Sequence, residues 1–533
     1  MGSRAAMGFP REIWWLVAKE LASRLDFDGL FSLARVSRGV AGLALPELYA
    51  VHDRSPAIDA HVDVEQFICL WRSLILSSLG KTLFPYCCWI KALRLGTFGS
   101  QLEDLAQDIP GLRTLFRPPL EHLQIPHCLD GALDIRAIVL EVARMITDYI
   151  RTSAEQQGTL AGLEAIEGFQ HPVANLRNLV LGLSSLTTLF IQDGYVLTSD
   201  VAHAIRVNCP AFRELECLYC YGPKVDQVLG GFLRNLEPNT LVSFKILSKS
   251  EVARETFRAL CVHSRSLRNL ELLSLGLPAF QSLDELRHCV SLESLELGPS
   301  PEAVIYPWHI ECRDAFEGVV RWLQNCTPLS HLGFTMVPAV TTLLARVLKS
   351  PTFHLESLRI ETQIEFDKAF CRSLAHQQQL QHLTLRIWDE DLLYADDDRC
   401  IEVAAAVARC RNLRELDTNE LFDLQNLDRI CSSLPLLETM AVTGTFIDEE
   451  FLRRISRLSK LKRLFLYGPS CISFDVLLGF LEKLAADPEG HHEGLQLHIP
   501  DQLDAHMTEQ QEAQLVAIIE ERFRGRLEYH QLL

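Results

Sequence analysis

The sequence predicts an α/β solenoid, in which short parallel strands form one wall and helices form the other. Three observations support this fold class. A short apolar phrase recurs along the chain, helix-like segments separate its copies, and cysteines recur where those segments meet the next copy. A small all-α head at the N-terminus completes the expected architecture.

The repeated phrase is clearest at residues 289–297, CVSLESLEL. Leu292, Leu295 and Leu297 follow the pattern L-x-x-L-x-L, whose last part has the two-residue period of a strand with one buried face. The first leucines of successive copies stand at 241, 267, 292, 329, 355, 380, 413, 437 and 461. Six steps are 24–26 residues and two are longer, at 37 and 33. Leucine-rich repeats run about 20–29 residues, so the two longer steps indicate insertions.

A single strand of this kind cannot bury its own leucines, whereas stacked units bury them in one continuous core. Parallel strands need a crossover, and helix-like segments such as 399–411 supply one. A cysteine ends several of these segments three residues before the next phrase begins, namely Cys209, Cys289, Cys326 and Cys410. These junctions resemble the cysteine-containing class of leucine-rich repeats.

Composition bounds the function of the chain. Its 533 residues are 48% hydrophobic, and no apolar run approaches the length of a membrane span. The 16 cysteines and the absence of an export signal predict free thiols in a reducing compartment, cytoplasmic and/or nuclear. A formal net charge of −18 without a basic cluster argues against nucleic acid as a partner. We expect neither nucleic-acid nor membrane binding.

Residues 9–50 predict three short helices. Pro10 is placed to start the first, and its apolar stripe holds Ile13, Leu16, Val17 and Leu21. Asp28 and Ser37 are candidate caps for the second and third helices, with Pro46 after the third. Three helices in about 40 residues make a very small core, so we expect this head to expose apolar surface to a partner.

The head resembles the F-box, and fungal members in particular through residues 44–49. The residues that carry the resemblance are Phe9-Pro10, Glu12-Ile13, Leu16, Leu21, Leu30, Leu33 and Val36-Ser37-Arg38. The resemblance implies docking on the Skp linker subunit of a cullin-type ubiquitin ligase. It assigns that contact to Phe9, Pro10, Ile13, Leu16, Leu21, Leu30, Leu33 and Val36. The alternative is a head that only caps the solenoid, because end repeats need a cover.

We divide the chain into a head at 1–52, a linking helix with divergent opening repeats at 53–170, the solenoid at 171–500 and a C-terminal capping helix at 501–533. The linking part predicts helices at 64–79 and 135–150, strands at 90–95 and 120–125, and a loop at 153–168. Residues 176–181 are a looser copy of the phrase, 495–499 a closing strand and 509–523 a final helix. Insertions at 298–312, 389–398 and 467–473 are candidate binding loops.

Three residue clusters have the composition of a chemical site. Cys217 and Cys220 have CxxC spacing without a second ligand pair, which favours a structural role. The carboxylates at 396–398 precede a helix, where they favour its N-terminal dipole, and His491-His492 reads as a solvated loop. No nucleotide-binding or hydrolase motif is present in the sequence. We therefore expect no catalytic residue, no metal, no cofactor and no enzymatic activity.

The wall of the predicted sheet is the remaining candidate site. Side chains that flank the second leucine of each phrase point away from the core, because side chains alternate along a strand. The candidate substrate-binding residues are Glu214, Glu216, Glu271, Glu296 and Arg359. We hypothesise that a basic patch on an unknown substrate protein docks there; a solvated face without a ligand is the alternative. The sequence thus predicts a substrate-recognition adaptor of a Skp-cullin-F-box ubiquitin ligase, or else a non-catalytic interaction scaffold.

Overall fold

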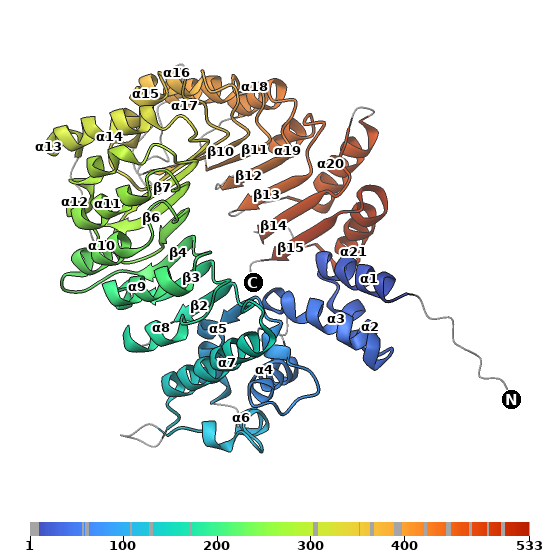
Figure 1. Cartoon of the computed structure of the whole chain (residues 1–533). Coiled ribbons are helices and arrows are strands. Elements are labelled where there is room, and N and C mark those ends of the chain that lie inside the picture. The colour runs from blue at the N-terminus through green and yellow to red at the C-terminus, as the bar shows by residue number, and fades with distance from the viewer. Residues whose placement is uncertain are drawn as a thin grey trace. The chain divides into compact units, whose positions relative to one another are not determined.

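A computed structural model gives the structure of the chain (Figure 1). It describes residues 10–55, 58, 63–106, 109–126, 132–169, 173–301, 308–350, 352–362, 367–387, 397–419, 424–443, 449–467, 472–487, 490–502 and 507–531. The chain forms two compact units that meet in sequence between Leu267 and Arg268, and each is described by itself. The expected boundaries at 52, 170 and 500 concern smaller segments and stay predictions.

The first unit begins with the three expected head helices, α1 (Arg11–Ser23), α2 (Phe27–Ala34) and α3 (Arg38–Ala50). Four more helices precede the repeats or connect the first of them: α4 (Val64–Ser78), α5 (Leu95–Leu105), α6 (Ile109–Leu115) and α7 (Ile135–Gln157). The helices predicted at 64–79 and 135–150 are therefore present. α7 runs seven residues beyond its expected end and stops at Gly158, whose positive φ of 64° suits a left-handed cap.

Five strands of the first unit pair in parallel and in chain order. They are β1 (Ala92–Arg94), β2 (Ala165–Phe169), β3 (Thr188–Asp193), β4 (Glu214–Tyr219) and β5 (Ser243–Ile246). One inward position is shared by all five strands, and it holds Leu93, Ile166, Leu189, Leu215 and Phe244. None of these side chains is more than 1% exposed, so the strands bury one continuous apolar row.

Helices cover one face of these strands: α8 (Val173–Leu179), α9 (Ser199–Asn208), α10 (Val225–Asn235) and α11 (Arg254–Leu260) (Figure 1). Asp226 joins two of them. Its carboxylate accepts hydrogen bonds from the backbone N–H groups of Ala253, Glu255 and Thr256, at 2.8, 3.1 and 2.9 Å. A side chain of α10 therefore satisfies the free donors at the start of α11, which fixes one repeat against the next.

The described residues of the second unit form ten parallel strands in chain order. They are β6 (Asn269–Leu275), β7 (Ser294–Pro299), β8 (His331–Thr335), β9 (Ser357–Thr362), β10 (His382–Ile387), β11 (Glu415–Asn419), β12 (Thr439–Thr443), β13 (Arg463–Tyr467), β14 (Gln496–Gln502) and β15 (Arg526–Gln531). The second leucines of the predicted phrases occupy the shared inward position, and from Leu270 to Leu497 none is more than 2% exposed. The periodic leucines therefore form the core, as predicted.

The helices of the second unit return the chain between strands. They are α12 (Leu277–Phe280), α13 (Trp308–Glu311), α14 (Arg313–Asn325), α15 (Val340–Val347), α16 (Lys368–Leu374), α17 (Asp397–Val407), α18 (Leu424–Ser433), α19 (Glu449–Ile455), α20 (Phe474–Ala486) and α21 (Glu509–Ile518). α14 illustrates why they form. Phe316, Val319, Val320 and Leu323 recur at helical spacing and are all buried, at 2% exposure or less.

The recurring cysteines pack where helices meet strands. Cys209, Cys289, Cys326 and Cys410 are at most 2% exposed. The Cys326 thiol donates to the Cys289 carbonyl at 3.6 Å, and Cys209 and Cys410 donate to carbonyls of preceding repeats, at 3.4 and 3.8 Å. The 13 cysteines that the structure describes are all free thiols, and most are buried.

The strand predicted at 120–125 is wrong. That segment is a short turn, Glu121–Leu123, between irregular stretches. The guanidinium of Arg72 binds the carbonyls of Leu115, Arg117 and Pro118 just before it, at 2.7, 2.9 and 2.6 Å. Within the segment, the N–H groups of Leu123 and Gln124 donate to the carbonyls of Leu120 and Glu121, at 3.0 and 3.1 Å, and these local hydrogen bonds take the place of a strand ladder.

Two further predictions in the first unit are wrong. The expected loop at 153–168 contains the end of α7 and most of β2, where a Cβ at Gly168 would overlap the backbone of Gly96. Residues 176–181 do not form a strand, because Leu176, Leu179 and Val180 have helical spacing and are buried as part of α8 and its end. The strand phrase lies ten residues later, at Leu186, Leu189 and Ile191.

At the C-terminus, β14 confirms the closing strand expected at 495–499. The final helix begins at Glu509 as expected, and its last turn, Ile519–Phe523, widens into a π-helix. The sequence analysis missed β15, which pairs in parallel with β14 beyond that helix. The repeats therefore have the predicted α/β character and the head is helical as predicted, with one more strand than expected at the C-terminal end.

Candidate protein-docking surfaces

The head has a small core of its own. Ala18, Ala22, Leu30, Leu33, Val40 and Ala44 form it, and none is more than 8% exposed. Asp26, rather than the expected Asp28, caps α2 by accepting a hydrogen bond from Gly29 N–H at 2.8 Å. Ser37 caps α3 as predicted, and this helix continues through Pro46 to Ala50. Three of these six residues are alanines, so the core of the head is small.

Exposed apolar side chains are concentrated on the head. Ile13, Leu16 and Val17 are 41%, 54% and 40% exposed, and their spacing places them on one face of α1. Phe31 on α2 and Val36 just after it are 56% and 59% exposed. Exposed apolar patches of this kind mark interaction sites.

The residues assigned to the Skp contact have different positions in the structure. Pro10, Ile13, Leu16 and Val36 are exposed, and Leu21 is partly buried against the head core. Leu30 and Leu33 are 0% and 8% exposed, so they support the surface from beneath. Phe9 lies outside the described residues. Phe31 was missed by the sequence analysis, because exposure is set by how three helices pack and not by residue type.

Aromatic contacts connect the head to the following helices. The Tyr49 hydroxyl of α3 shares a hydrogen bond of 2.7 Å with Ser73 of α4, and its ring stacks on Tyr86 with centroids 4.8 Å apart. Burial raises the pKa of Tyr49 to about 12. The hydroxyl therefore stays protonated at neutral pH, and this contact fixes the end of α3 against α4.

The outward wall of the first unit carries Glu214 and Glu216 on β4, as predicted. Glu214 is exposed and accepts a hydrogen bond from the Thr188 hydroxyl at 3.3 Å. Glu216 is half-buried and is the register partner of Phe190 on β3 and Lys245 on β5. The wall here is therefore mixed in charge rather than uniformly acidic.

The outward wall of the second unit holds the other predicted residues. Glu271 and Glu296 are register partners on β6 and β7, so two carboxylates stand side by side. Arg359 on β9 lies 3.8 Å from Glu296 and 2.7 Å from Glu361. The structure thus brings Glu271, Glu296 and Arg359 onto one wall, where the arginine offsets part of the negative charge.

Two features of the outward surfaces were missed by the sequence analysis. Phe465, Tyr467 and His498 cluster on β13 and β14, with ring centroids 5.5–6.2 Å apart. In the first unit, Tyr195 and Tyr221 follow β3 and β4 and are 41% and 48% exposed. Phe465, Tyr467 and His498 are half-buried, whereas Tyr195 and Tyr221 are exposed in the way that is typical of binding hot spots. The repeat phrase gives no signal for either group, because they lie outside its leucine positions.

The CxxC cysteines and His492 are buried inside the fold. Cys217 and Cys220 are fully buried, and contact with the Cys220 thiol together with burial raises the pKa of Cys217. The prediction that His492 belongs to a solvated loop is wrong. Its side chain is 4% exposed, and its Nδ1 contacts the Leu461 carbonyl at 2.7 Å.

Neither a metal site nor a membrane span is found in the part of the chain that the structure describes. Its His, Cys, Asp and Glu residues form no group of three or more that could hold a metal ion. None of its helices has the length and apolar character needed to cross a membrane. The side chains of the carboxylates at 396–398 and most of the predicted insertion loops lie outside what the structure describes.

The geometry defines a class of protein. One strand per repeat, parallel pairing in chain order, leucines at the shared inward position and helices on the opposite face define a leucine-rich-repeat solenoid.

No family model and no curated protein matches the sequence. Similar solved structures include an internalin from Listeria monocytogenes, at 16% identity and a TM-score of 0.35, covering 65% of this chain and 82% of that one. Rad7 in complex with Elc1 from yeast is 14% identical with a TM-score of 0.35, and the match covers 70% of this chain and 89% of that one. The leucine-rich-repeat protein LegL7 from Legionella pneumophila is 13% identical with a TM-score of 0.33, and the match covers 57% of this chain and 90% of that one. At this level of similarity none of them assigns a function to this chain.

Proposed function

We propose that this protein is a substrate-recognition adaptor of a Skp-cullin-F-box type ubiquitin ligase. The head docks on the Skp linker subunit, and the solenoid holds a substrate protein near the ubiquitin-loaded enzyme. The adaptor contributes proximity and no active site of its own. The observation that carries the proposal is the exposed apolar surface of the head, formed by Ile13, Leu16, Val17, Phe31 and Val36.

The second candidate function is an interaction scaffold whose head only caps the solenoid. A pure cap buries its apolar side chains against the repeats, as Leu30 and Leu33 are buried inside the head. More than half of the surface of Leu16, Phe31 and Val36 is exposed instead. This exposure, together with the F-box resemblance of the same helices, favours the adaptor over the cap.

A co-elution experiment tests the docking step. The purified chain is mixed with a Skp linker subunit and separated by size, beside the variants Phe31→Asp and Val207→Asp. Val207 lies on α9 and is 65% exposed, so it controls for adding a charge to an exposed apolar position outside the head. We expect the parent and Val207→Asp to co-elute with Skp and Phe31→Asp to elute alone. A parent chain that elutes alone contradicts the adaptor and leaves the scaffold.

The substrate is proposed to present a basic segment to the outward wall of the second unit. Lysine-rich peptides, measured by fluorescence anisotropy, probe this idea without the ligase. The double variant Glu271→Lys with Glu296→Lys should weaken binding and reduce its salt dependence, because the two carboxylates stand on neighbouring strands. Glu449→Lys on α19 is the matched control, since its side chain is 62% exposed on a helix. If the double variant and Glu449→Lys bind the peptides equally well, the acidic wall is ruled out as their binding site.

A further inference from the structure

The last strand of the second unit lies at an edge of the sheet. β15 pairs with β14 on one side, and no other strand of the described chain pairs with it. An edge strand can template the addition of another strand, so natural sheets usually keep their edge strands short or cover them. In the first unit, β1 has three residues, and Arg94 lies 3.6 Å from Asp53 in the turn that follows the head. β15 has six residues, so it is long enough to pair with a further strand.

The hydrogen bonds of β15 indicate which of its backbone groups point to the edge. The Arg526 N–H donates to the Leu495 carbonyl at 2.8 Å, and Arg526 and Gln496 are register partners. Along a parallel strand, alternate residues direct both their N–H and their C=O to the same neighbouring strand. Arg526 and Glu528 therefore direct these groups to β14, whereas Leu527 directs its N–H and C=O to the edge. A second strand beside β15 finds one donor and one acceptor at this residue.

The apolar core is less well covered at this edge. Leu464, Leu497 and Leu527 are register partners on β13, β14 and β15, at the shared inward position. Leu464 and Leu497 are 1% and 2% exposed, whereas Leu527 is half-buried. A leucine of the core row therefore keeps apolar surface in contact with water. A further strand beside β15 would bury that surface, which favours its addition.

Two outward side chains of β15 are opposite in charge. Arg526 and Glu528 lie on the same face, with side chains that are 76% and 37% exposed, and contact each other at 3.1 Å. Glu528 also contacts His498 of β14 at 2.7 Å, which holds its carboxylate on this face. If a second copy of β15 pairs antiparallel with Leu527 opposite Leu527, each Arg526 stands opposite Glu528 of the other copy. A pairing centred on Arg526 or on Glu528 places like charges opposite each other instead, which is destabilising. Charge and backbone direction therefore select the same register, and the strand is complementary to itself.

We propose that β15 is a dimerisation strand, which pairs antiparallel with β15 of a second copy of this chain about a two-fold axis between the two Leu527 residues. Leu527 of each copy donates its N–H to the Leu527 carbonyl of the other, and an Arg526–Glu528 pair flanks this centre on either side. The two leucine side chains cover each other and continue the core row from one copy into the next. Two-fold pairing of identical surfaces is the commonest mode of assembly among soluble oligomers. This inference does not depend on the proposed ligase role.

Sedimentation velocity of the full chain over a range of concentrations measures the association, and we expect an equilibrium between monomer and dimer. Arg526→Glu should weaken dimerisation about tenfold, because it places two like-charge pairs across the axis. Glu528→Arg should have the same effect for the same reason. The double variant, in which the two charges are exchanged, should restore the Kd to within about threefold of the parent. Arg411→Glu, at an exposed position between α17 and β11, is the matched control and should dimerise as the parent does.

Hydrogen exchange followed by mass spectrometry locates the contact. The peptide that spans β15 should exchange more slowly at a concentration where the dimer forms than at one where the chain is monomeric, because the Leu527 N–H gains a partner. The peptide that spans β9, which has a strand on each side, should exchange at the same rate in both conditions. An unchanged thermal midpoint in each variant shows that the substitutions at exposed positions leave the fold intact.

Three results would overturn the pairing. A chain that stays monomeric at high micromolar concentration excludes it. A dimer that forms without slower exchange in the β15 peptide uses another surface. A dimer that Arg526→Glu and Glu528→Arg leave unchanged, or that the folded double variant fails to restore, does not have the proposed register. All measurements use the chain without Skp, so failure to bind Skp leaves them intact.

Discussion

Truncating three exposed side chains of the head should weaken Skp binding without weakening the fold. The variant combines Leu16→Ala, Phe31→Ala and Val36→Ala, at positions that are 54%, 56% and 59% exposed. Complete burial of such a side chain is worth about 1.5–3 kcal/mol. Because about half of each remains to be buried, docking should gain about 1 kcal/mol from each. The three together give about 3 kcal/mol, or roughly a hundredfold in Kd.

Two comparisons isolate docking from folding. Leu160→Ala with Val207→Ala removes apolar groups that are 74% and 65% exposed outside the head, and should leave the Kd unchanged. Leu30→Ala removes a side chain that is 0% exposed, and should lower the free energy of unfolding by about 2–5 kcal/mol.

The assay is calorimetric titration of Skp into each variant, together with urea unfolding followed by fluorescence. We expect the triple variant to unfold at nearly the parent urea concentration, because exposed substitutions usually change stability by about 0.5 kcal/mol or less each. A Kd within threefold of the parent would refute the assignment of these side chains to the docking surface.

Three further predictions concern single groups. Asp226→Ala should lower the free energy of unfolding by about 2–4 kcal/mol in urea titrations, because it removes three backbone caps; Asp200→Ala, at an exposed acid in the first turn of α9, should cost under about 1 kcal/mol. Burial lowers the pKa of His263 in the folded state below its usual value of 6.5. As the pH drops below about 6.5, the unfolded state therefore takes up the proton more readily, and the free energy of unfolding should fall. The difference between the urea midpoints at pH 7.5 and pH 5.5 should be smaller in His263→Gln than in the parent. Hydrogen bonds from Cys87 and Ser153 lower the pKa of Cys88 to about 7, so its alkylation rate should rise through pH 7, whereas buried Cys410, with a pKa of about 12, should not react before unfolding.

The sequence predicted the strand positions of the regular repeats well, because burial requires a leucine at the same place in every copy. Leu292, Leu295 and Leu297 are each at most 1% exposed, as the phrase requires. The irregular opening repeats were predicted less well. At residues 176–181 helical and strand spacing coincide in a short apolar run, and the neighbouring phrase from Leu186 decides which segment becomes the strand.

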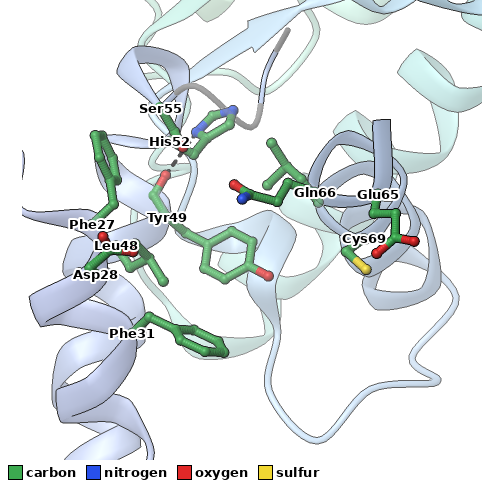
Figure 2. A pocket seen from close by; sticks show the side chains of 11 residues that line it. Phe27, Asp28, Phe31, Leu48, Tyr49, His52, Ser55, Glu65, Gln66 and Cys69 are labelled. Atoms are coloured by element: carbon green, nitrogen blue, oxygen red, sulfur yellow. Dashed lines mark hydrogen bonds between the residues drawn. The ribbon is translucent and has the colours of Figure 1, made fainter. Parts of the chain in front are cut away.

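The docking surfaces were predicted only in part. Leu16 and Leu30 are the same residue type in the same motif, yet one is 54% exposed and the other 0%. Their difference arises from the crossing of three helices, which periodicity does not encode. The pocket that Tyr49 and His52 line has the same origin, since α4 supplies its second wall from beyond the head (Figure 2). The fold follows from local periodicity, whereas these sites depend on tertiary packing.

The shared register of the strands limits how many repeats a helical partner can contact in phase along the outward wall. Side chains such as Glu271, Glu296 and Gly333 occupy one row, spaced by the separation of strands, about 4.8 Å. An α-helix lying along that row advances about 5.4 Å per turn, so it gains about 0.6 Å of mismatch at each strand. After about four strands the two patterns are out of phase by half a spacing. A straight helical ligand can therefore match only about four consecutive repeats, and a longer one has to bend or engage the wall in separate segments.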